Sequence, residues 1–393
     1  MQKKCILVLT STFPRWHADS DPSFVFELCR RLNEKYKIII LAPRSPGTQV
    51  QETIDGLTVI RYPYFISRYE TLSNDGGIMA KLRQNPLRYL LIPFFLAGQF
   101  LAVRKILRNR KIDLIHAHWL FPQGWIAHWF CRKKSDPALV CTSHGTDLFG
   151  LKSYIFKILR KQVGKDATAI TVVSQAMRDQ LIAEGMKSEK IHVLPMGVDL
   201  TTQFTPGNNT PERDKTLLFV GRLVDKKGVT HLLKSLFLVK HVIPDCRLLI
   251  AGDGPARAQL ENEARTLGLT EHVTFLGAIE NRQLPEIYRR AGIFVSASLE
   301  EGFGLVYVEA LGCECAVIAA ELPAIKDIII NNNTGLLVEQ RNPDDLAEKI
   351  ILLLNKPGLR QKIALSGREY ALKSFDWENS AKRYTQLFER LLN

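Results

Sequence analysis

Short apolar runs alternate with amphipathic stretches along most of this chain. Residues 22–36 place Phe24, Leu28 and Leu32 on one face, which predicts a helix after the first strand. The second half repeats the plan from Leu217 onward. Alternating strands and helices predict open, mostly parallel sheets that helices cover on both faces. In the first half, the runs predicted as strands are residues 5–10, 37–43, 57–63, 113–119, 138–144, 169–174 and 191–195.

A polar linker divides this pattern into two halves. Residues 193–215 are rich in Pro, Gly, Asn and Thr, which is typical of a connection between domains. A chain of 393 residues is long enough for two domains. We predict domains at residues 1–198 and 199–372, followed by an amphipathic helix at residues 373–393.

The stretch 296–315 contains the most informative glycines. It lies between two apolar runs that we expect to be buried strands. Gly302 and Gly304 permit backbone conformations that a side chain forbids, and they let a ligand approach the main chain. A helix is expected to begin near Leu305 and end at Gly312. Its free N–H groups and the positive end of its dipole then form an anion site.

Two carboxylates, Glu301 and Glu309, flank this predicted anion site. If the segment were helical throughout, eight steps would separate them by about 12 Å, too far for a retaining glycosidase pair at roughly 5 Å. An ionised carboxylate also accepts hydrogen bonds from the vicinal hydroxyls of a ribose or hexose. An anion site between two such groups indicates a nucleotide sugar, whereas two solvated surface glutamates are the alternative interpretation.

The segment EGFGLVYVEAL, at Glu301–Leu311, resembles the E-x7-E signature of glycosyltransferase family 4. The likeness covers most of the chain and is strongest from residue 190 onward. It implies the GT-B fold, an α/β architecture in which two Rossmann-like, doubly wound domains face each other across a cleft. The first domain then binds the acceptor, the second binds the donor, and the C-terminal helix crosses back to the first domain. Further segments that resemble the family are residues 217–236, 248–255, 273–279 and 332–350.

The resemblance also assigns a donor site. Fixed cations stabilise the charge that builds on a leaving diphosphate, and Arg222 and Lys227 match the family's cations. In this scheme Glu309 binds the ribose, while Glu301 and His144 orient the hexose. The implied catalytic residues are His144, Arg222, Lys227 and Glu301. The implied contacts to the nucleotide-sugar donor are Gly221, Arg222, Lys227, Gly302, Phe303, Gly304, Leu305 and Glu309.

Two further polar segments follow predicted strands in the first half. HGTD matches the family motif as a unit, and it places His144 and Asp147 on a turn; a core histidine satisfied by backbone groups is the alternative. His118, in HAHW, is expected with Asp147 on the acceptor side. His116 and His118 have no third ligand at a metal-binding spacing, so we predict no metal site.

The resulting functional hypothesis is a retaining, metal-independent hexosyltransferase without a cofactor. It moves a sugar from a nucleoside diphosphate sugar to a hydroxyl of a lipid-linked or saccharide acceptor. The resemblance implies attack on the same face as the leaving phosphate, which accepts the acceptor's proton. A role in bacterial surface polysaccharide, lipopolysaccharide or glycolipid biosynthesis is expected. A nucleotide-sugar 2-epimerase of the same architecture is the alternative, and it would convert the donor without an acceptor.

Charge is distributed unevenly between the two halves. Residues 1–198 contain 29 Lys and Arg against 15 Asp and Glu, whereas the remainder has 24 against 25. Such a basic half fits an anionic membrane surface or nucleic acid. We predict no nucleic-acid partner, because no zinc finger, basic zipper or aromatic recognition motif accompanies the charge. Seven cysteines without a CxxC pair favour reduced thiols in the cytoplasm.

The most apolar stretch is residues 89–103, which basic residues border on both sides. Fifteen residues with Pro93, Gly98 and Gln99 are too few to span a bilayer. A segment lying in the membrane interface and a buried core helix both fit the composition. The charge excess favours membrane association, hence an enzyme that is peripheral on the inner face of the cytoplasmic membrane.

The segment 11–24 follows the first predicted strand. It has DSDPS where many members of the resembled family carry paired glycines, so a backbone contact to phosphate is not expected there. Arg15, His17 and Asp19 are candidates for substrate contact, with a solvated polar loop as the alternative.

Overall fold

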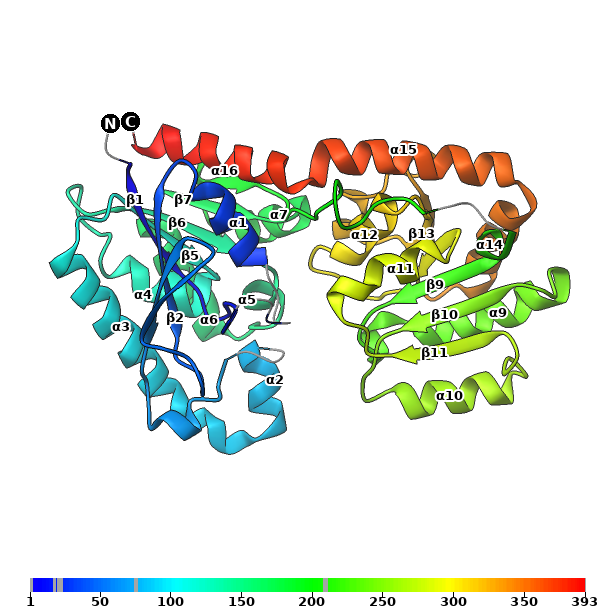
Figure 1. Cartoon of the computed structure of the whole chain (residues 1–393), viewed down its shortest axis with the longest axis horizontal. Coiled ribbons are helices and arrows are strands. Elements are labelled where there is room, and N and C mark those ends of the chain that lie inside the picture. The colour runs from blue at the N-terminus through cyan, green and yellow to red at the C-terminus, as the bar shows by residue number, and fades with distance from the viewer. Residues whose placement is uncertain (1–2, 17–18, 20–23, 74–76, 208–210, 393) are drawn as a thin grey trace. The chain divides into compact units, whose positions relative to one another are not determined.

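The structure is a computed structural model that describes all residues except 1–2, 17–18, 20–23, 74–76, 208–210 and 393. The chain divides into two compact units, which are described separately. Unit 1 contains Met1–Gly197 and Ser380–Asn393, and unit 2 contains Val198–Asn379. Each unit is an α/β domain with its own sheet (Figure 1).

Unit 1 is built on an eight-stranded sheet in the order β3-β4-β2-β1-β5-β6-β7-β8. All neighbouring strands are parallel except the edge pair β3 and β4, which is antiparallel. Strands β1 and β5 are buried along their whole length, as expected for strands covered on both faces. The strands are β1 (Cys5–Leu9), β2 (Lys37–Pro43), β3 (Gln51–Ile54), β4 (Leu57–Tyr62), β5 (Leu114–His118), β6 (Ala138–Ser143), β7 (Ala169–Val172) and β8 (Ile191–Val193).

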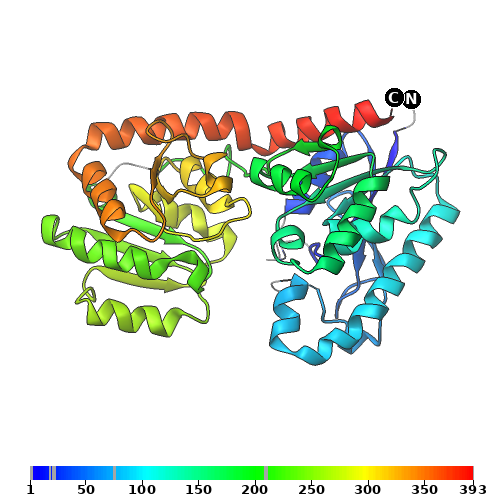
Figure 2. The same cartoon turned by 180° about the vertical axis from the view of Figure 1, so that it is seen from behind.

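Helices cover both faces of this sheet (Figures 1 and 2). α1 and the end of α16 lie on one face, where Tyr36 packs on Phe388. α3, α4 and α6 lie on the other face. The elements are α1 (Phe24–Leu32), η1 (Ser67–Tyr69), α2 (Gly77–Gln84), η2 (Pro86–Leu91), α3 (Ile92–Asn109), η3 (Leu120–Gly124), α4 (Trp125–His128), α5 (Thr146–Phe149), α6 (Tyr154–Asp166), α7 (Gln175–Ala183) and η4 (Ser188–Lys190).

Unit 2 has a six-stranded parallel sheet in the order β11-β10-β9-β12-β13-β14. Numbered within the unit, this is the order 3-2-1-4-5-6 of dinucleotide-binding Rossmann folds. Its core is made of aliphatic side chains from the sheet and from α9, α10 and α14. The strands are β9 (Thr216–Val220), β10 (Arg247–Ala251), β11 (Val273–Gly277), β12 (Ile293–Ser296), β13 (Ala316–Ala320) and β14 (Leu336–Val338).

The last helix of the chain crosses back from unit 2 to unit 1. It begins at Trp377, and from Ser380 onward it belongs to unit 1, where Tyr384 and Phe388 are buried. The elements of this second half are α8 (Pro211–Asp214), η5 (Asp225–Lys227), α9 (Val229–Val242), α10 (Arg257–Thr266), η6 (Asn281–Gln283), α11 (Leu284–Arg289), α12 (Leu305–Gly312), α13 (Pro323–Lys326), α14 (Pro343–Asn355), α15 (Pro357–Phe375) and α16 (Trp377–Leu392).

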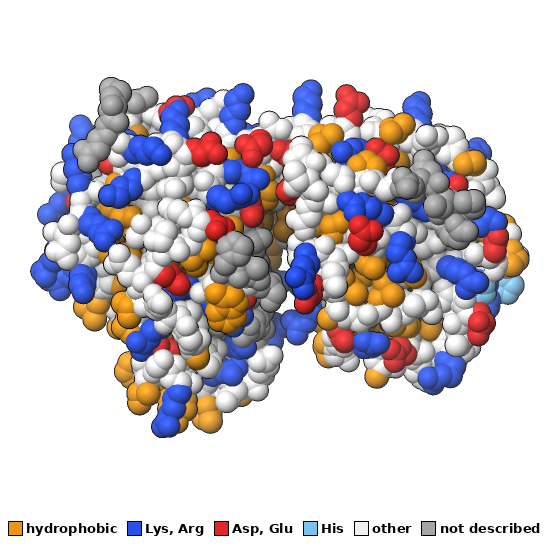
Figure 3. All heavy atoms as spheres, in the orientation of Figure 1, with side chains coloured by type: hydrophobic (Ala, Val, Ile, Leu, Met, Phe, Trp, Pro, Cys, Tyr) orange, Lys and Arg blue, Asp and Glu red, His pale blue; other side chains and the backbone are white. Residues whose placement is uncertain are grey.

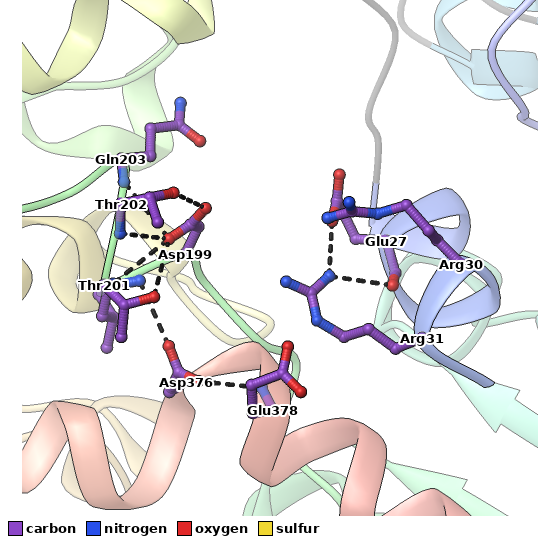
Figure 4. Close-up of polar contacts among 10 residues, drawn as sticks. Glu27, Arg30, Arg31, Asp199, Thr201, Thr202, Gln203, Asp376 and Glu378 are labelled. Carbon is purple, nitrogen blue, oxygen red and sulfur yellow. Dashed lines mark hydrogen bonds and ion pairs between the residues drawn. The ribbon is translucent and has the colours of Figure 1, made fainter. Parts of the chain in front are cut away.

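A short bridge joins the two places at which the chain leaves unit 2. Val198 pairs with Asp376, the residue between α15 and α16, and its N–H donates to the carbonyl of Phe375 at 2.9 Å. Asp199 then caps the next turn, accepting from the amide and the hydroxyl of Thr202 (Figure 4). The part of the predicted linker from Val198 to Thr202 is therefore hydrogen-bonded within unit 2, although its composition is typical of a loose linker.

The structure differs from the sequence-based expectations at two places in unit 1. Strand β3 was not predicted, because its residues QETI are polar and largely exposed at the edge of the sheet. The apolar stretch 89–103, expected to be too short to span a bilayer, belongs to a longer helical run that is largely exposed rather than a buried core helix. Together η2 and α3 form one helical run, Pro86–Asn109, which is long and apolar enough to cross a membrane by length and composition alone. Only 22% of its most apolar window is buried.

Candidate active site

The ligand sites of open α/β sheets lie at the carboxyl ends of strands where the strand order reverses. In unit 2 this switch point lies between β9 and β12, and in unit 1 it lies between β1 and β5. The loop after β9 carries Arg222 and Lys227, and the loop after β12 carries Glu301. In unit 1, His118 ends β5. The topology therefore brings the predicted site residues to the switch point of each unit.

Glycines allow the loops of unit 2 to pack backbone against backbone. A Cβ at Gly252 would lie 1.9 Å from the carbonyl oxygen of Gly221, and one at Gly228 would lie 2.0 Å from that of Ala297. Gly228 also has a φ of 65°, in the left-handed region that favours glycine. These contacts fix the loop after β9 against the loops after β10 and β12. Gly252, in the segment 248–255 that resembles the family, thus has a packing role.

Lys227 and Glu301, in the loops that follow the neighbouring strands β9 and β12 of unit 2, form an ion pair. The Nζ of Lys227 lies 2.6 Å from Oε1 of Glu301, and the hydroxyl of Ser298 donates to the same oxygen at 2.9 Å. Both charged side chains are largely shielded from solvent. Arg222 is exposed, and within the described ranges it forms no ion pair. In the loop after β9, the side chain of Arg222 therefore faces solvent, whereas Glu301 holds that of Lys227 in place.

The segment after Glu301 forms the predicted turn and helix. Helix α12 begins at Leu305 and ends at Gly312, which confirms both predicted ends. Gly304 caps it with a φ of 98°, and a Cβ there would lie 2.7 Å from the ring of Tyr307. The start of α12 follows directly after the loop from β12, so its free N–H groups lie at the carboxyl edge of the sheet.

Glu309 lies inside α12 and is buried. The hydroxyl of Tyr288 donates to its Oε2 at 2.8 Å. Burial raises the pKa of Glu309 from 4.5 to about 7, and the bond from Tyr288 offsets part of this rise. Further hydrogen-bond donors stabilise the ionised form of a carboxyl group in this environment, because each hydrogen bond offsets part of the cost of burying the charge.

The predicted histidines of unit 1, His118 and His144, form a cluster in which His118 is buried and His144 is half-buried. Nδ1 of His118 lies 2.9 Å from Nε2 of His144, and their rings stack at 5.2 Å. Phe24 and Trp119 pack on the ring of His144 at 4.7 and 5.1 Å. Burial lowers the pKa of His144 to about 3 and that of His118 well below its ordinary value. Both rings are therefore neutral near pH 7, and one of them donates the shared hydrogen bond to the other.

A second polar chain leads from His116 to the C-terminal helix. Nε2 of His116 lies 2.7 Å from the hydroxyl of Thr142, which lies 2.6 Å from that of Thr171. The hydroxyl of Tyr384, on α16, is 3.3 Å from both threonine oxygens. Burial lowers the pKa of His116 to about 3. Helix α16 thus contacts the histidine cluster through Tyr384 and the two threonine hydroxyls.

Asp147 and His118, predicted on the acceptor side, are both buried. One carboxylate oxygen of Asp147 accepts from the amide of Leu120 at 2.7 Å, and the other accepts from the hydroxyl of Ser143 at 2.8 Å. Asp147 thereby ties the loop after β5 to the end of β6. These bonds and the burial of both residues are typical of side chains that position a loop, and their place on the acceptor side stays a prediction.

The loop after β1 is described only in part. Arg15 holds Asp19 through two hydrogen bonds of 2.9 Å, so these two candidates bind each other. His17, the third candidate in this loop, lies outside the described residues.

Several residues that contact the predicted site residues are absent from the sequence-based predictions. Except for Trp119, they carry no local signal, because each lies in an ordinary apolar or polar stretch and reaches its neighbours only through folding. Trp119 does carry a signal, since its position directly after HAH places it at a strand end, where it adopts a φ of 74°. The missed residues are Phe24, Trp119, Thr142 and Thr171 in unit 1, Tyr384 in α16, and Tyr288 and Ser298 in unit 2.

Comparison with known proteins identifies the family. Residues 23–202 match the model described as Glycosyltransferase Family 4, and residues 201–370 match that of Glycosyl transferases group 1. An uncharacterized glycosyltransferase of Methanocaldococcus jannaschii is 32% identical over 298 residues, 76% of this chain and 81% of the relative. The chain belongs to glycosyltransferase family 4.

Other relatives of this glycosyltransferase have named activities. The phosphatidyl-myo-inositol mannosyltransferase of Mycobacterium tuberculosis is 28% identical over 378 residues, 93% of this chain and 92% of that enzyme. Among solved structures, sucrose-phosphate synthase of Thermosynechococcus elongatus has a TM-score of 0.78 and 23% identity over 99% of both chains. HepE of Anabaena, in complex with UDP, has a TM-score of 0.74 and 16% identity, covering 98% of this chain and 100% of that one. These structures establish the GT-B fold of two Rossmann-like domains.

Proposed function

We propose that this glycosyltransferase moves a hexose from a nucleoside diphosphate sugar to a hydroxyl of a lipid-linked acceptor, with retention of the anomeric configuration. The observation that carries the proposal is the edge of unit 2 at its switch point. There an exposed cation, Arg222, a held cation, Lys227, and the start of α12 follow two adjacent strands. Positive charge and free N–H groups at such an edge suit a diphosphate.

Each site residue has a role in this proposal. Arg222, Lys227 and the backbone from Gly302 to Leu305 hold the diphosphate and stabilise the charge that develops as it leaves. Glu309 accepts hydrogen bonds from the ribose. Glu301, which Lys227 and Ser298 orient, accepts from hydroxyls of the transferred sugar.

In unit 1, His144 contacts the transferred sugar in the proposal, and His118 orients its ring. The acceptor hydroxyl attacks the anomeric carbon on the face that the leaving phosphate occupies. A phosphate oxygen takes the hydroxyl proton as the new glycosidic bond forms and the bond to the phosphate breaks. The scheme needs no metal and no covalent enzyme intermediate.

A lipid-linked acceptor is supported by two observations. The mycobacterial relatives are named for mannosyl transfer to phosphatidyl-myo-inositol, and the basic excess of this chain lies in residues 1–198. An enzyme with a lipid acceptor works where that lipid is found, so we place it in the cytoplasm, peripheral on the inner face of the membrane. Its product would enter glycolipid or surface polysaccharide biosynthesis.

A binding panel tests the donor site first. Thermal unfolding is measured with nucleoside diphosphates and their sugars, because a ligand that binds the folded state raises the midpoint. We expect a shift with one base, and its loss in Arg222→Ala. The matched control is Lys362→Gln, which removes an exposed charge on α15. No shift with any nucleotide in a folded preparation would contradict the proposal.

The preferred donor is then incubated with lipid extracts and with soluble saccharides. A product that keeps the anomeric configuration, followed by nuclear magnetic resonance, supports retention, and an inverted product refutes it. Conversion of the donor sugar to its epimer without any acceptor would instead identify a nucleotide-sugar 2-epimerase.

A further inference from the structure

One side of the helical run η2–α3 is apolar and exposed in unit 1. The opposite side anchors the run, since Phe95, Gln99, Val103 and Ile106 are buried. Leu90 and Leu101 are 70% and 60% exposed, values that are unusual for large apolar side chains. We call this side the α3 face, and its apolar members are Leu87, Tyr89, Leu90, Phe94, Ala97 and Leu101.

The α3 face becomes basic towards the end of the helix. Arg104, Lys105 and Arg108 are exposed there, one to two turns beyond Leu101. Residues 76–135 contain eleven Lys and Arg and a single acidic residue, Asp113, which accepts from the amide of Cys5. In Figure 3, hydrophobic side chains gather at the lower tip of unit 1, and Lys and Arg side chains line its left edge, where α3 ends in Figure 1.

A groove beside α3 extends the apolar surface. It has a volume of about 360 Å³, and apolar side chains of α3 and α4 line it. Trp129, at its edge, is exposed and lies 5.4 Å from the guanidinium of Arg132. Exposed Lys133 and Lys134 follow in the chain. The groove is lined by Leu96, Ala97, Phe100, Trp125, Ile126 and Trp129.

We propose that the α3 face and this groove dock unit 1 on an anionic lipid bilayer. The apolar and aromatic side chains enter the boundary between headgroups and acyl chains, and the basic residues contact anionic headgroups. We infer an anionic bilayer from charge complementarity. The surface is apolar with a basic border, and residues 76–135 contain only one acidic residue, so the surface is complementary to anionic lipid.

The helix lies along the membrane rather than across it. Crossing would require its anchored side, with Phe95 and Val103, to leave the core of unit 1. The docking surface is independent of catalysis, and only its link to the lipid acceptor rests on the proposed function.

Flotation of the full chain with vesicles tests the proposal. Vesicles of phosphatidylglycerol and phosphatidylcholine are compared with phosphatidylcholine alone, without donor or acceptor. We expect binding to the anionic vesicles that weakens as salt is added. Replacing Arg104, Lys105 and Arg108 by Gln should weaken binding roughly 100-fold, because each basic residue near an anionic surface contributes about fivefold.

Apolar substitutions test the other half of the surface. Leu90→Ser and Phe94→Ser should each weaken binding about tenfold, since less apolar area enters the lipid. Controls in unit 2 change equally exposed side chains, with Val242→Ser and Leu365→Ser for the apolar set. For the basic set, the control replaces Lys356, which precedes α15, and Lys362 and Lys373 of α15 by Gln. Circular dichroism of every variant verifies folding.

Three results would overturn the docking proposal. They are the absence of binding to anionic vesicles, an equal loss in the unit 2 controls, and a dimer in solution that Leu90→Ser dissociates while vesicles remain unbound. The last result would assign the face to a second copy of the chain. Transfer to a soluble acceptor is measured separately. A variant that loses vesicle binding but keeps this transfer separates docking from the proposed function.

Discussion

Replacing Glu309 by Gln tests the buried carboxyl group of α12 directly. Burial raises the pKa of Glu309 from 4.5 to about 7. The folded state therefore holds the proton more tightly than the unfolded state, so this contribution to stability is fully present below pH 4.5. It is lost as the pH rises through about 7. The full shift corresponds to about 3 kcal/mol of unfolding free energy in unit 2.

Glu309→Gln keeps the shape of the side chain and an oxygen that can accept from Tyr288. It carries no ionisable group, so the variant lacks this pH dependence. We expect both proteins to be equally stable at about pH 4, and the variant to be more stable by about 3 kcal/mol at about pH 8.5. Hydrogen exchange of unit 2 peptides in urea, followed by mass spectrometry, measures the difference.

Nucleotide binding should change in the opposite direction. A neutral amide offers one acceptor oxygen, whereas an ionised carboxylate accepts from both ribose hydroxyls. Affinity for the donor nucleotide should fall roughly 10- to 100-fold, the cost of one hydrogen bond to a charged group. Glu300→Gln, at an exposed position of the loop that precedes α12, is the control for both measurements. A stability difference that is the same at both pH values would refute the effect of burial, and unchanged affinity would refute the ribose contact.

Three other predictions concern the remaining parts of the site. Arg222→Ala should lower turnover about 100- to 1000-fold with little change in stability, because in the proposed mechanism this exposed cation stabilises the leaving phosphate. Steady-state kinetics measures turnover, and an unchanged value would contradict that role. Gly252→Ala should destabilise unit 2 by about 3 kcal/mol because its Cβ meets a backbone oxygen, whereas Gly358→Ala, which meets nothing within 4 Å, should be nearly neutral in urea unfolding. The unfolding free energy of unit 1 should fall by about 3 kcal/mol between about pH 7.5 and about pH 5.5, because His116 and His144, whose pKa is lowered to about 3, hold the proton less tightly in the folded state. Tryptophan fluorescence follows this unfolding, since four of the five tryptophans lie in unit 1, and a stability that does not change with pH would contradict the prediction.

The amino-acid sequence alone was enough to predict the class of fold and the local shape of the loop that leads into α12. Strand and helix periods are local properties, because side chains at fixed spacings share a face whatever the rest of the chain does. For that reason the ends of α12, at Leu305 and Gly312, followed from the glycines and the apolar run. Motif resemblance likewise led to the family, because the matching residues are contiguous in the chain.

The contacts between residues far apart in the chain are visible only in the folded structure. Tyr288 and Glu309 are 21 residues apart, and Thr142 and Tyr384 are 242 apart, so no local spacing encodes these contacts. The pKa values of the buried groups depend on the same packing, because burial by several distant segments removes water from them. The stretch 89–103 shows the same limit, since its composition fits both core and surface. Its exposed face exists because unit 1 covers only one side of α3.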